Sequence, residues 1–310
     1  MMLTLFCIPK PFHGHVGVIQ CNAIQSWLQL QPNSEIVLCG DDDGVLEAAA
    51  TFNVRHFPDI TRNEFGTPIL SDAFERVQQI ARNPLIGYVN ADMILLPDVI
   101  RALQSVSLQQ YLMVGRRTDL DITAPIDFEQ SDWQAALREQ AKFEGKVQHF
   151  DHIDYFIFNR GLVRNMPAFA VGRPGWDNWF IYNFRAQSIP VIDATAAVTA
   201  IHQNHDYAHV LRASGDRWEG PEADHNRALM GGKAHRFYIV DATHKLTNEG
   251  KLVEATDNEY LERRASRQAI FTADADPISR FFARAMGWIG RNRAKMPASL
   301  WQWVILKLAK

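Results

Sequence analysis

A largely apolar run decides the fold: residues 85–98 have the sequence LIGYVNADMILLPD. Its first five residues are apolar or aromatic, which is typical of a strand that is buried on both faces of a parallel sheet. Asn90 and Asp92 follow directly, at the carboxyl end of this strand, where open α/β sheets bind their ligands. The run therefore predicts a central strand that carries the Asp92 carboxylate to the edge of a sheet. A helix cap is the alternative role for Asp92.

Strands and helices are expected to alternate on both sides of this run. Apolar patterning and turn residues predict strands at 3–8, 35–39, 54–57 and 111–115, and helices at 13–30, 45–51, 69–81 and 97–108. This alternation predicts an α/β fold with a doubly wound sheet. The chain has no Gly-x-Gly-x-x-Gly after the first strand and no Gly-x-x-x-x-Gly-Lys-Ser/Thr, which argues against dehydrogenases and P-loop proteins.

Composition narrows the class further. The 310 residues are 47% hydrophobic and 22% charged, with a net charge of -3, so nothing in the overall charge favours nucleic acid as a partner. The three cysteines, Cys7, Cys21 and Cys39, lie in apolar stretches without metal-site spacing, and we expect them to be reduced core residues. No basic leader and no apolar stretch of about 20 residues is present, which predicts a cytoplasmic protein.

Acidic residues follow the second predicted strand in the sequence GDDDG, at residues 40–44. Carboxylates at a strand end can accept hydrogen bonds from a ribose or a base edge, and Asp41 and Asp42 are the candidates. Asp and Gly also suit a turn and an N-cap for the helix at 45–51, which leaves two readings of equal weight.

Two tryptophans enclose an acid in the segment Trp176-Asp177-Asn178-Trp179, and a helix is expected to begin directly after it. Aromatic rings cover the apolar face of a sugar, while Asp and Asn side chains bind its hydroxyl groups. Partial desolvation by the rings would also raise the pKa of Asp177 towards the range of a general base. The alternative is an N-cap Asp between two core tryptophans. An acidic, histidine-containing segment at 149–154 precedes a further strand at 155–158. It is either a polar loop, the favoured reading, or a rim that faces an acceptor, and Asp154 at the entrance of the strand is its residue of interest.

A histidine cluster follows the apolar stretch at 191–201. It has the sequence HQNHDYAH, with three histidines and an acid within eight positions. We expect functional histidines here, with His202 and His205 as the candidates. Asn204 and Asp206 are predicted to orient them or to contact a substrate.

Taken in chain order, these motifs resemble the pattern of GT-A-fold glycosyltransferases over residues 1–245. The Asn90-x-Asp92 tripeptide corresponds to the Asp-x-Asp motif of that family, with Asn90 in place of the first acid. The resemblance implies a Rossmann-related mixed sheet, and an enzyme that transfers a hexose from a nucleotide-sugar donor to an acceptor hydroxyl.

The resemblance also implies roles for single residues. A divalent cation, Mn or Mg, is expected on Asp92 together with His202 or His205. Asn90 and Asp92 would bind the nucleotide diphosphate, Asp41 or Asp42 the nucleoside, and Asp177 would orient or deprotonate the acceptor. Trp176, Asn178 and Trp179 would contact the sugar. The acceptor class, a carbohydrate or glycolipid in polysaccharide assembly, is an expectation from the fold resemblance alone.

Three other functions remain open at this point. A sugar-1-phosphate nucleotidyltransferase would use a related sheet, but the segment at 9–14 lacks most of the glycine-rich basic loop that it needs. A metal-dependent hydrolase could be built on His202 and His205. A non-catalytic carbohydrate- or nucleotide-binding protein would explain the missing first acid at Asn90.

The C-terminal residues 246–310 are predicted to form an extension with amphipathic helices. Residues 278–310 combine tryptophans with arginines and lysines and contain no acid. Such a segment can lie on an anionic membrane surface, which predicts a peripheral protein at the inner face of the membrane. It can also dock on the main domain or on a second subunit.

Overall fold

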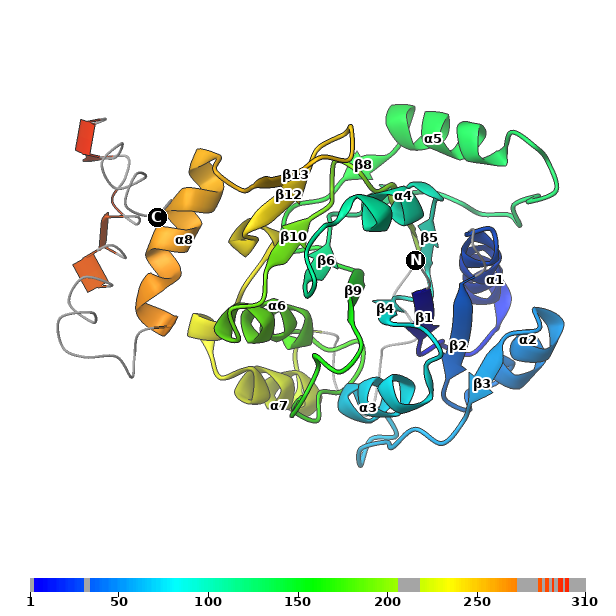
Figure 1. Cartoon of the computed structure of the whole chain (residues 1–310). Helices are drawn as coiled ribbons and strands as arrows, with labels where there is room; N and C mark the ends of the chain where they lie inside the picture. The colour runs from blue at the N-terminus through cyan, green and yellow to red at the C-terminus, as the bar shows by residue number, and fades with distance from the viewer. Residues whose placement is uncertain are drawn as a thin grey trace.

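The structure of the protein is a computed structural model that describes residues 3–30, 34–205 and 218–271, and of the C-terminal part residues 284–285, 288–289, 292, 295–297 and 299–300. The main sheet contains β1 (Leu3–Cys7), β2 (Glu35–Cys39), β3 (Arg55–Phe57), β4 (Leu85–Val89), β6 (Leu112–Val114), β9 (Tyr155–Asn159), β10 (Val191–Asp193), β12 (His244–Leu246) and β13 (Leu252–Glu254). Their order in space is β13-β12-β10-β6-β9-β4-β1-β2-β3 (Figure 1).

The sheet is mixed because two strands run against the rest. β3, β2, β1 and β4 are mutually parallel, as are β6, β10 and β12. β9 lies between these two groups and is antiparallel to both β4 and β6, and β13 is antiparallel to β12. The predicted mixed α/β sheet is confirmed. Since Val89 at the end of β4 pairs with Tyr155 at the start of β9, the residues that precede β9 lie beside Asn90.

Helices cover both faces of the sheet. They are α1 (Gly14–Leu28), α2 (Val45–Thr51), α3 (Leu70–Ile80), α4 (Asp98–Ser105), α6 (Trp176–Ala186), α7 (Pro221–Met230) and α8 (Asn258–Phe271). Strand residues alternate between two hydrophobic clusters: Tyr88 and Phe158 pack with α3, α6 and α7, whereas Val89 and Ile157 pack with α1, α2 and α4. Gly87 allows the close approach at the centre, because a Cβ there would lie 2.6 Å from Leu5 Cδ2.

A second sheet lies beside the carboxyl end of β4. It contains β5 (Met93–Leu95), β7 (Thr118–Leu120), β8 (Lys146–Val147) and β11 (Ala200–Gln203), in the order β5-β11-β7-β8. The apolar residues that follow Asp92 therefore leave the main sheet and pair with β11. α5 (Trp133–Phe143) packs on this sheet through a third hydrophobic cluster that includes Trp133 and Leu137.

The predicted strands and helices between residues 3 and 115 are all present, with ends that shift by at most three residues. Cys7, Cys21 and Cys39 are free, and Cys21 is half-buried rather than in the core. β12 spans position 245, and the domain division predicted there stays a prediction.

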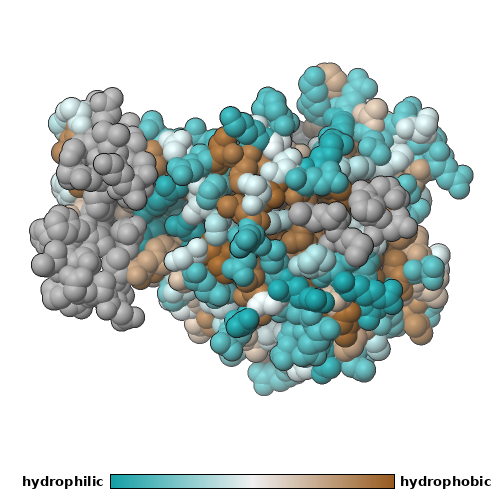
Figure 2. Space-filling model, in the orientation of Figure 1, coloured by the Kyte–Doolittle hydropathy of each residue, from teal (hydrophilic) through white to brown (hydrophobic). Residues whose placement is uncertain are grey.

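The basic segment predicted at 278–310 lies mostly outside the described residues, so its attachment to a membrane also stays a prediction. Among the described helices, none has the length and apolar character to cross a bilayer. Figure 2 shows that hydrophilic residues cover much of the lower part of the face seen in Figure 1, with hydrophobic residues in a central band.

Candidate active site

Three side chains with metal-ligand atoms converge beside the end of β4. Asp92 follows that strand, His202 lies in β11 and His205 follows β11. Strand pairing brings them together, because His202 is opposite Met93 of β5 on one side and Asp119 of β7 on the other. The ligand atoms of Asp92, His202 and His205 lie within 4.8 Å of one another. We call these three residues the Asp92 triad.

The geometry of the Asp92 triad fits a divalent cation. Asp92 Oδ2 lies 3.0 Å from His205 Nε2 and 3.8 Å from His202 Nε2. Ligand atoms that each lie about 2.1 Å from one metal ion are about 3 Å apart when they sit at right angles. The other carboxylate oxygen, Asp92 Oδ1, is buried and has no hydrogen-bond partner among the described residues. A buried acceptor of this kind is normally satisfied, and a cation would satisfy it.

Electrostatics keep Asp92 in its charged form. Burial by itself raises the pKa of this carboxyl group, but the hydrogen bond with His205 and the nearby charges of His202 and Lys10 act in the opposite direction. The net result is a pKa well below the usual value for Asp. Asp92 is therefore a permanent anion at neutral pH, as a cation ligand must be.

Arg117, a buried residue between β6 and β7, links the Asp92 triad to a second group of acids. Its Nε lies 2.8 Å from Asp119 Oδ1, and that oxygen lies 3.4 Å from His202 Nδ1. Its Nη1 donates to Asp154 Oδ2 at 2.6 Å, and the other oxygen of Asp154 accepts a hydrogen bond from Asn90 Nδ2 at 2.5 Å. The Asn90 amide is thus a donor at the position where the Asp-x-Asp motif has an acid.

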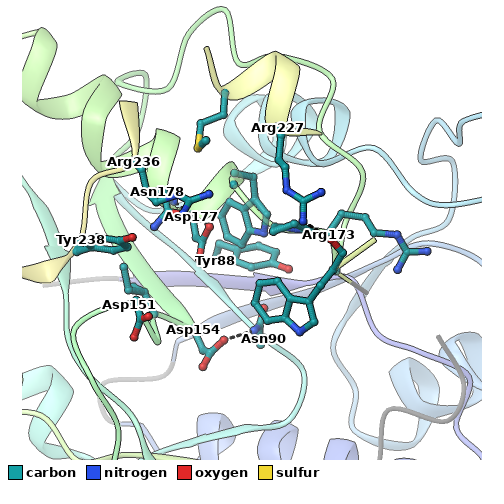
Figure 3. Close-up of a pocket in the computed structure, with 17 residues that line it drawn as sticks. Tyr88, Asn90, Asp151, Asp154, Arg173, Asp177, Asn178, Arg227, Arg236 and Tyr238 are labelled. Atoms are coloured by element: carbon teal, nitrogen blue, oxygen red, sulfur yellow. Dashed lines mark hydrogen bonds between the residues drawn. The ribbon is translucent and has the colours of Figure 1, made fainter. Parts of the chain in front are cut away.

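A cavity of about 360 Å³ opens beside Asn90 and Asp154. Its walls come from the end of β4, the segment that precedes β9, the segment 172–175 with the start of α6, the helix α7 and the segment 236–238. The polar side chains in its lining are Asn90, Asp151, Asp154, Arg173, Asp177, Asn178, Arg227, Arg236 and Tyr238 (Figure 3). Its volume suits a small polar molecule.

Asp177 lies in the first turn of α6 and faces this cavity. The helix begins there because Gly175 adopts a φ of 107°, a conformation that residues with a side chain rarely take. Burial, helped by the charge of Asp154, raises the pKa of Asp177 to about 6, against the hydrogen bond that the Asn178 backbone N–H donates. A carboxyl group with this pKa can accept a proton at neutral pH.

The two predicted nucleoside ligands lie at the surface and share one cation. Arg62 Nη2 donates to Asp41 Oδ1 at 2.6 Å and to Asp42 Oδ2 at 3.0 Å. The bond with Arg62 lowers the pKa of Asp41. Both acids follow β2 and so lie at the carboxyl edge of the sheet, as predicted. Their role towards a nucleoside stays a prediction.

The two predicted sugar-stacking tryptophans differ in their placement. Trp176 lines the cavity, and its ring also packs on Phe156, with centroids 4.9 Å apart. Trp179 packs on Phe169 in the core and is not among the residues that line the cavity. Trp218, which the sequence did not single out, lines the cavity and is 54% exposed. A ring for stacking is therefore available from Trp218 as well as from Trp176.

The remaining predicted contact residues lie at different places. Asn178 lines the cavity and donates from Nδ2 to the backbone oxygen of Phe237 at 2.9 Å. Asn204 lies beside the Asp92 triad in the chain and donates to Asp121 Oδ1 at 2.7 Å. Asp206 lies outside the described residues. Asn178 is therefore placed to contact a ligand in the cavity, whereas Asn204 is not among the residues that line it.

The residues that connect the Asp92 triad to the cavity carry little signal in the sequence. Arg117 and Asp119 lie on a short, weakly patterned stretch, and their importance depends on the pairing of β7 with β11, about 80 residues later in the chain. Arg227, Arg236 and Tyr238 lie on or after α7, where no motif was apparent. The weak signal available was an Arg-x-Asp sequence directly after a predicted strand.

Comparisons with known proteins give likenesses among solved structures only. No family model matches the chain, and no curated protein matches it. The chain is similar to the structure of TarS from S. aureus in complex with UDP-GlcNAc, with 10% identity and a TM-score of 0.45 over 94% of this chain and 92% of that one.

It is also similar to glucosyl-3-phosphoglycerate synthase from Mycobacterium tuberculosis in complex with Mn2+, UDP-glucose and phosphoglyceric acid, with 13% identity and a TM-score of 0.43 over 74% of this chain and 78% of that one. A third likeness is to 4-diphosphocytidyl-2C-methyl-D-erythritol synthase from Anaerococcus prevotii, with 9% identity and a TM-score of 0.36 over 61% of this chain and 85% of that one.

Proposed function

We propose that the protein is a nucleotide-sugar glycosyltransferase that moves a hexose to an acceptor hydroxyl. The observation that carries the proposal is the pairing of two unlike acids at one edge of the sheet. Asp92 is held ionised in a set of metal-type ligands, and Asp177 faces a cavity with a pKa raised to about 6. Group transfer from a diphosphate to a hydroxyl needs both: charge stabilisation on the leaving side and a base on the accepting side.

Asp92, His202 and His205 would hold the divalent cation, Mn or Mg. When bound, the cation supplies positive charge that stabilises the diphosphate as it leaves the sugar. His202 is oriented for this task by Asp119, which approaches its Nδ1, and Asp119 is in turn held by Arg117. Asp41 or Asp42 would bind the nucleoside at the neighbouring strand end.

Asp177 would orient the acceptor hydroxyl and take its proton as the hydroxyl oxygen bonds to the sugar carbon. The cavity supports this role because it places Asp177 beside Asn178, Trp176 and Trp218, which can bind hydroxyl groups or stack on a ring. A base so placed agrees with inversion at the sugar carbon.

A thermal-shift panel tests the donor side of this proposal. UDP, GDP, CDP and dTDP are each added with and without Mn. Ligand at 100 times its Kd stabilises the native state by about 2.7 kcal/mol, which raises the melting temperature. We expect one nucleotide to give a shift that needs the metal and is lost in Asp92→Ala. The matched control is Asp132→Asn, an exposed acid at the start of α5 whose side chain makes no capping bond.

The other outcomes separate the rival functions. No shift with any nucleotide contradicts the proposal. Metal-dependent release of sugar from its nucleotide without an acceptor favours a hydrolase centred on the Asp92 triad. Tight nucleotide binding without transfer or hydrolysis favours a binding protein, and formation of a nucleotide-sugar from a sugar 1-phosphate favours a nucleotidyltransferase.

A further inference from the structure

The cavity beside Asp177 has an acidic wall and a basic wall. Asp151 and Asp154 lie beside the ends of β4 and β9, and Asp177 lies at the start of α6. Arg227 comes from α7, Arg236 from the segment after α7 and Arg173 from the segment before α6 (Figure 3). An uncharged acceptor has no need of three guanidinium groups. A cation that is already paired with an acid of the protein is less suited to bind an anionic ligand than one without such a partner.

Two of the three arginines are paired with acids. Arg173 donates from Nε and Nη2 to Glu222 Oε2, at 3.0 and 2.6 Å, and both side chains are buried. Arg227 Nη1 lies 2.8 Å from Asp224 Oδ1, in a pair that is partly exposed. Arg173 therefore serves the attachment of α7. Arg227 is paired with Asp224 and also donates from Nη2 to the backbone oxygen of Trp218.

Arg236 is different, because it has no ion pair and no side-chain hydrogen bond within the described part of the chain. Its position is nevertheless well defined. The backbone oxygen of Arg236 accepts hydrogen bonds from Arg263 Nη2 and Arg267 Nη2, at 2.9 and 2.8 Å. Two guanidinium groups of α8 thus hold this segment against the sheet and leave the guanidinium of Arg236 directed to the cavity (Figure 3).

The acids of the opposite wall do not neutralise Arg236. Asp154 is occupied by Arg117 and Asn90. Asp151 is exposed and lies 2.8 Å from His152 Nδ1 and 3.5 Å from His149 Nδ1. A half-buried guanidinium that makes no ion pair within the described residues, in a cavity of small-molecule size, favours a ligand that brings its own anionic group.

We propose that the acceptor is a small polyhydroxylated molecule that carries a carboxylate or a phosphate group. Its anionic group binds Arg236, with Arg227 beside it, and its reacting hydroxyl reaches Asp177. This inference rests on the proposed transferase function, because Asp177 is the acceptor base there. It adds that charge, and not only hydroxyl pattern, selects the acceptor.

A matched ligand series tests the proposal with the full chain in the presence of Mn and UDP. The probes are glucose, glucuronate and glucose 6-phosphate, which differ in bearing no charge, a carboxylate or a phosphate on the same ring. Binding is measured by calorimetry. We expect one or both charged sugars to bind about tenfold or more tightly than glucose, since a hydrogen bond to a charged group is worth more than a neutral one. The better of the two identifies the anionic group.

Variants locate the binding. Arg236→Gln should lower the affinity for the charged sugar about tenfold and leave glucose unchanged, whereas Arg236→Lys should retain part of the preference. The matched control is Arg164→Gln, an exposed arginine outside the cavity that donates to the Gly161 backbone oxygen. Repeating the titration in Asp92→Ala excludes an anion bound at the Asp92 triad.

Two results would overturn the inference. One is equal binding of glucose and the charged sugars, or no binding of any of them. The other is charged-sugar binding that survives Arg236→Gln. In either case binding with Mn of the nucleotide that the thermal-shift panel selects, used in place of UDP where the two differ, reports on the transferase proposal by itself. Loss of the acceptor preference alone is therefore distinguishable from failure of the proposed function.

Discussion

Asp92 and Asp177 are acids at the same edge of one sheet, yet their surroundings act on them in opposite directions. At Asp92, the hydrogen bond with His205 and the electrostatic effects of His202 and Lys10 outweigh burial and lower the pKa. Asp177 is desolvated by burial and lies near the charge of Asp154, and its pKa rises to about 6. The role of each carboxylate is therefore set by its surroundings in the fold: Asp92 is a permanent anion, and Asp177 can accept a proton.

The largest effect, on the rate of transfer, is expected from a substitution of Asp177. Asp177→Asn keeps the shape of the side chain but cannot take a proton, so transfer should fall by about 10² to 10⁴. In the unsubstituted protein, kcat/KM should rise with pH through about 6 and then level off. Asp151→Asn, which removes another acid from the same cavity, should keep that pH dependence. A pH profile that is unchanged in Asp177→Asn would contradict the role of base.

The same substitution has an opposite effect on stability. Because the folded state raises the pKa of Asp177 above the unfolded value, ionisation costs stability as pH rises from about 4 to 6, and the cost is then constant. Asp177→Asn should therefore melt at a higher temperature than the parent protein at pH 7, and the difference should disappear below about pH 4. Melting curves at the two pH values measure this.

The next largest effect is expected at Arg117, which joins the two regions. Arg117→Gln leaves Asp119 and Asp154 without their shared cation, and removal of one partner from a buried ion pair costs about 3–5 kcal/mol. We expect this loss in the free energy of unfolding, measured with urea, together with weaker Mn binding, because Asp119 no longer holds His202. Arg138→Gln, which breaks the half-exposed pair with Asp98, is the matched control. Equal losses in the two variants would contradict the linking role.

Asn90 binds Asp154, the acid that Arg117 also binds, and a substitution there tests this contact separately. Asn90→Asp replaces a donor to Asp154 by a second carboxylate, so that a hydrogen bond becomes a like-charge contact. The expected cost is about 1–3 kcal/mol at pH 7. The cost should shrink as pH falls, because the pair can then share a proton. A gain in stability at pH 7 would contradict this prediction, because it would show that the hydrogen bond from Asn90 to Asp154 does not stabilise the folded state.

Local sequence predicted the strand β4, the end of that strand and the position of Asp92, because a buried strand has a strong apolar signal and a sharp polar end. It could not reveal that His202 lies between Asp92 and Asp119, since this depends on β11 entering between β5 and β7. The same holds for Asn90, whose partner Asp154 comes from the antiparallel pairing of β4 with β9.

The tryptophans show a different limit. A helix was expected to begin after Trp179, which would leave both rings in a loop beside the sugar. α6 instead begins at Trp176, so the two rings are three positions apart on one helical face. That face packs into the core, and the first ring alone also reaches the cavity. Because the positive φ of Gly175 starts the helix at Trp176, only Trp176 of these two tryptophans lies where it can stack on a ligand in the cavity.

The smallest effect is expected at Asp41, where an acid is neither buried nor part of the linked network. Its bond with Arg62 is exposed, and exposed pairs are typically worth about 0–1 kcal/mol, so Asp41→Asn should change the melting temperature little. If Asp41 binds the nucleoside, affinity for the preferred nucleotide should nevertheless fall, by about tenfold for one lost charge-assisted hydrogen bond. Titration of nucleotide and Mn into Asp41→Asn and Asp42→Asn measures this. Unchanged affinity in both variants would contradict a role in nucleotide binding. The two acids would then have a structural role, as partners of Arg62 in the turn that precedes α2.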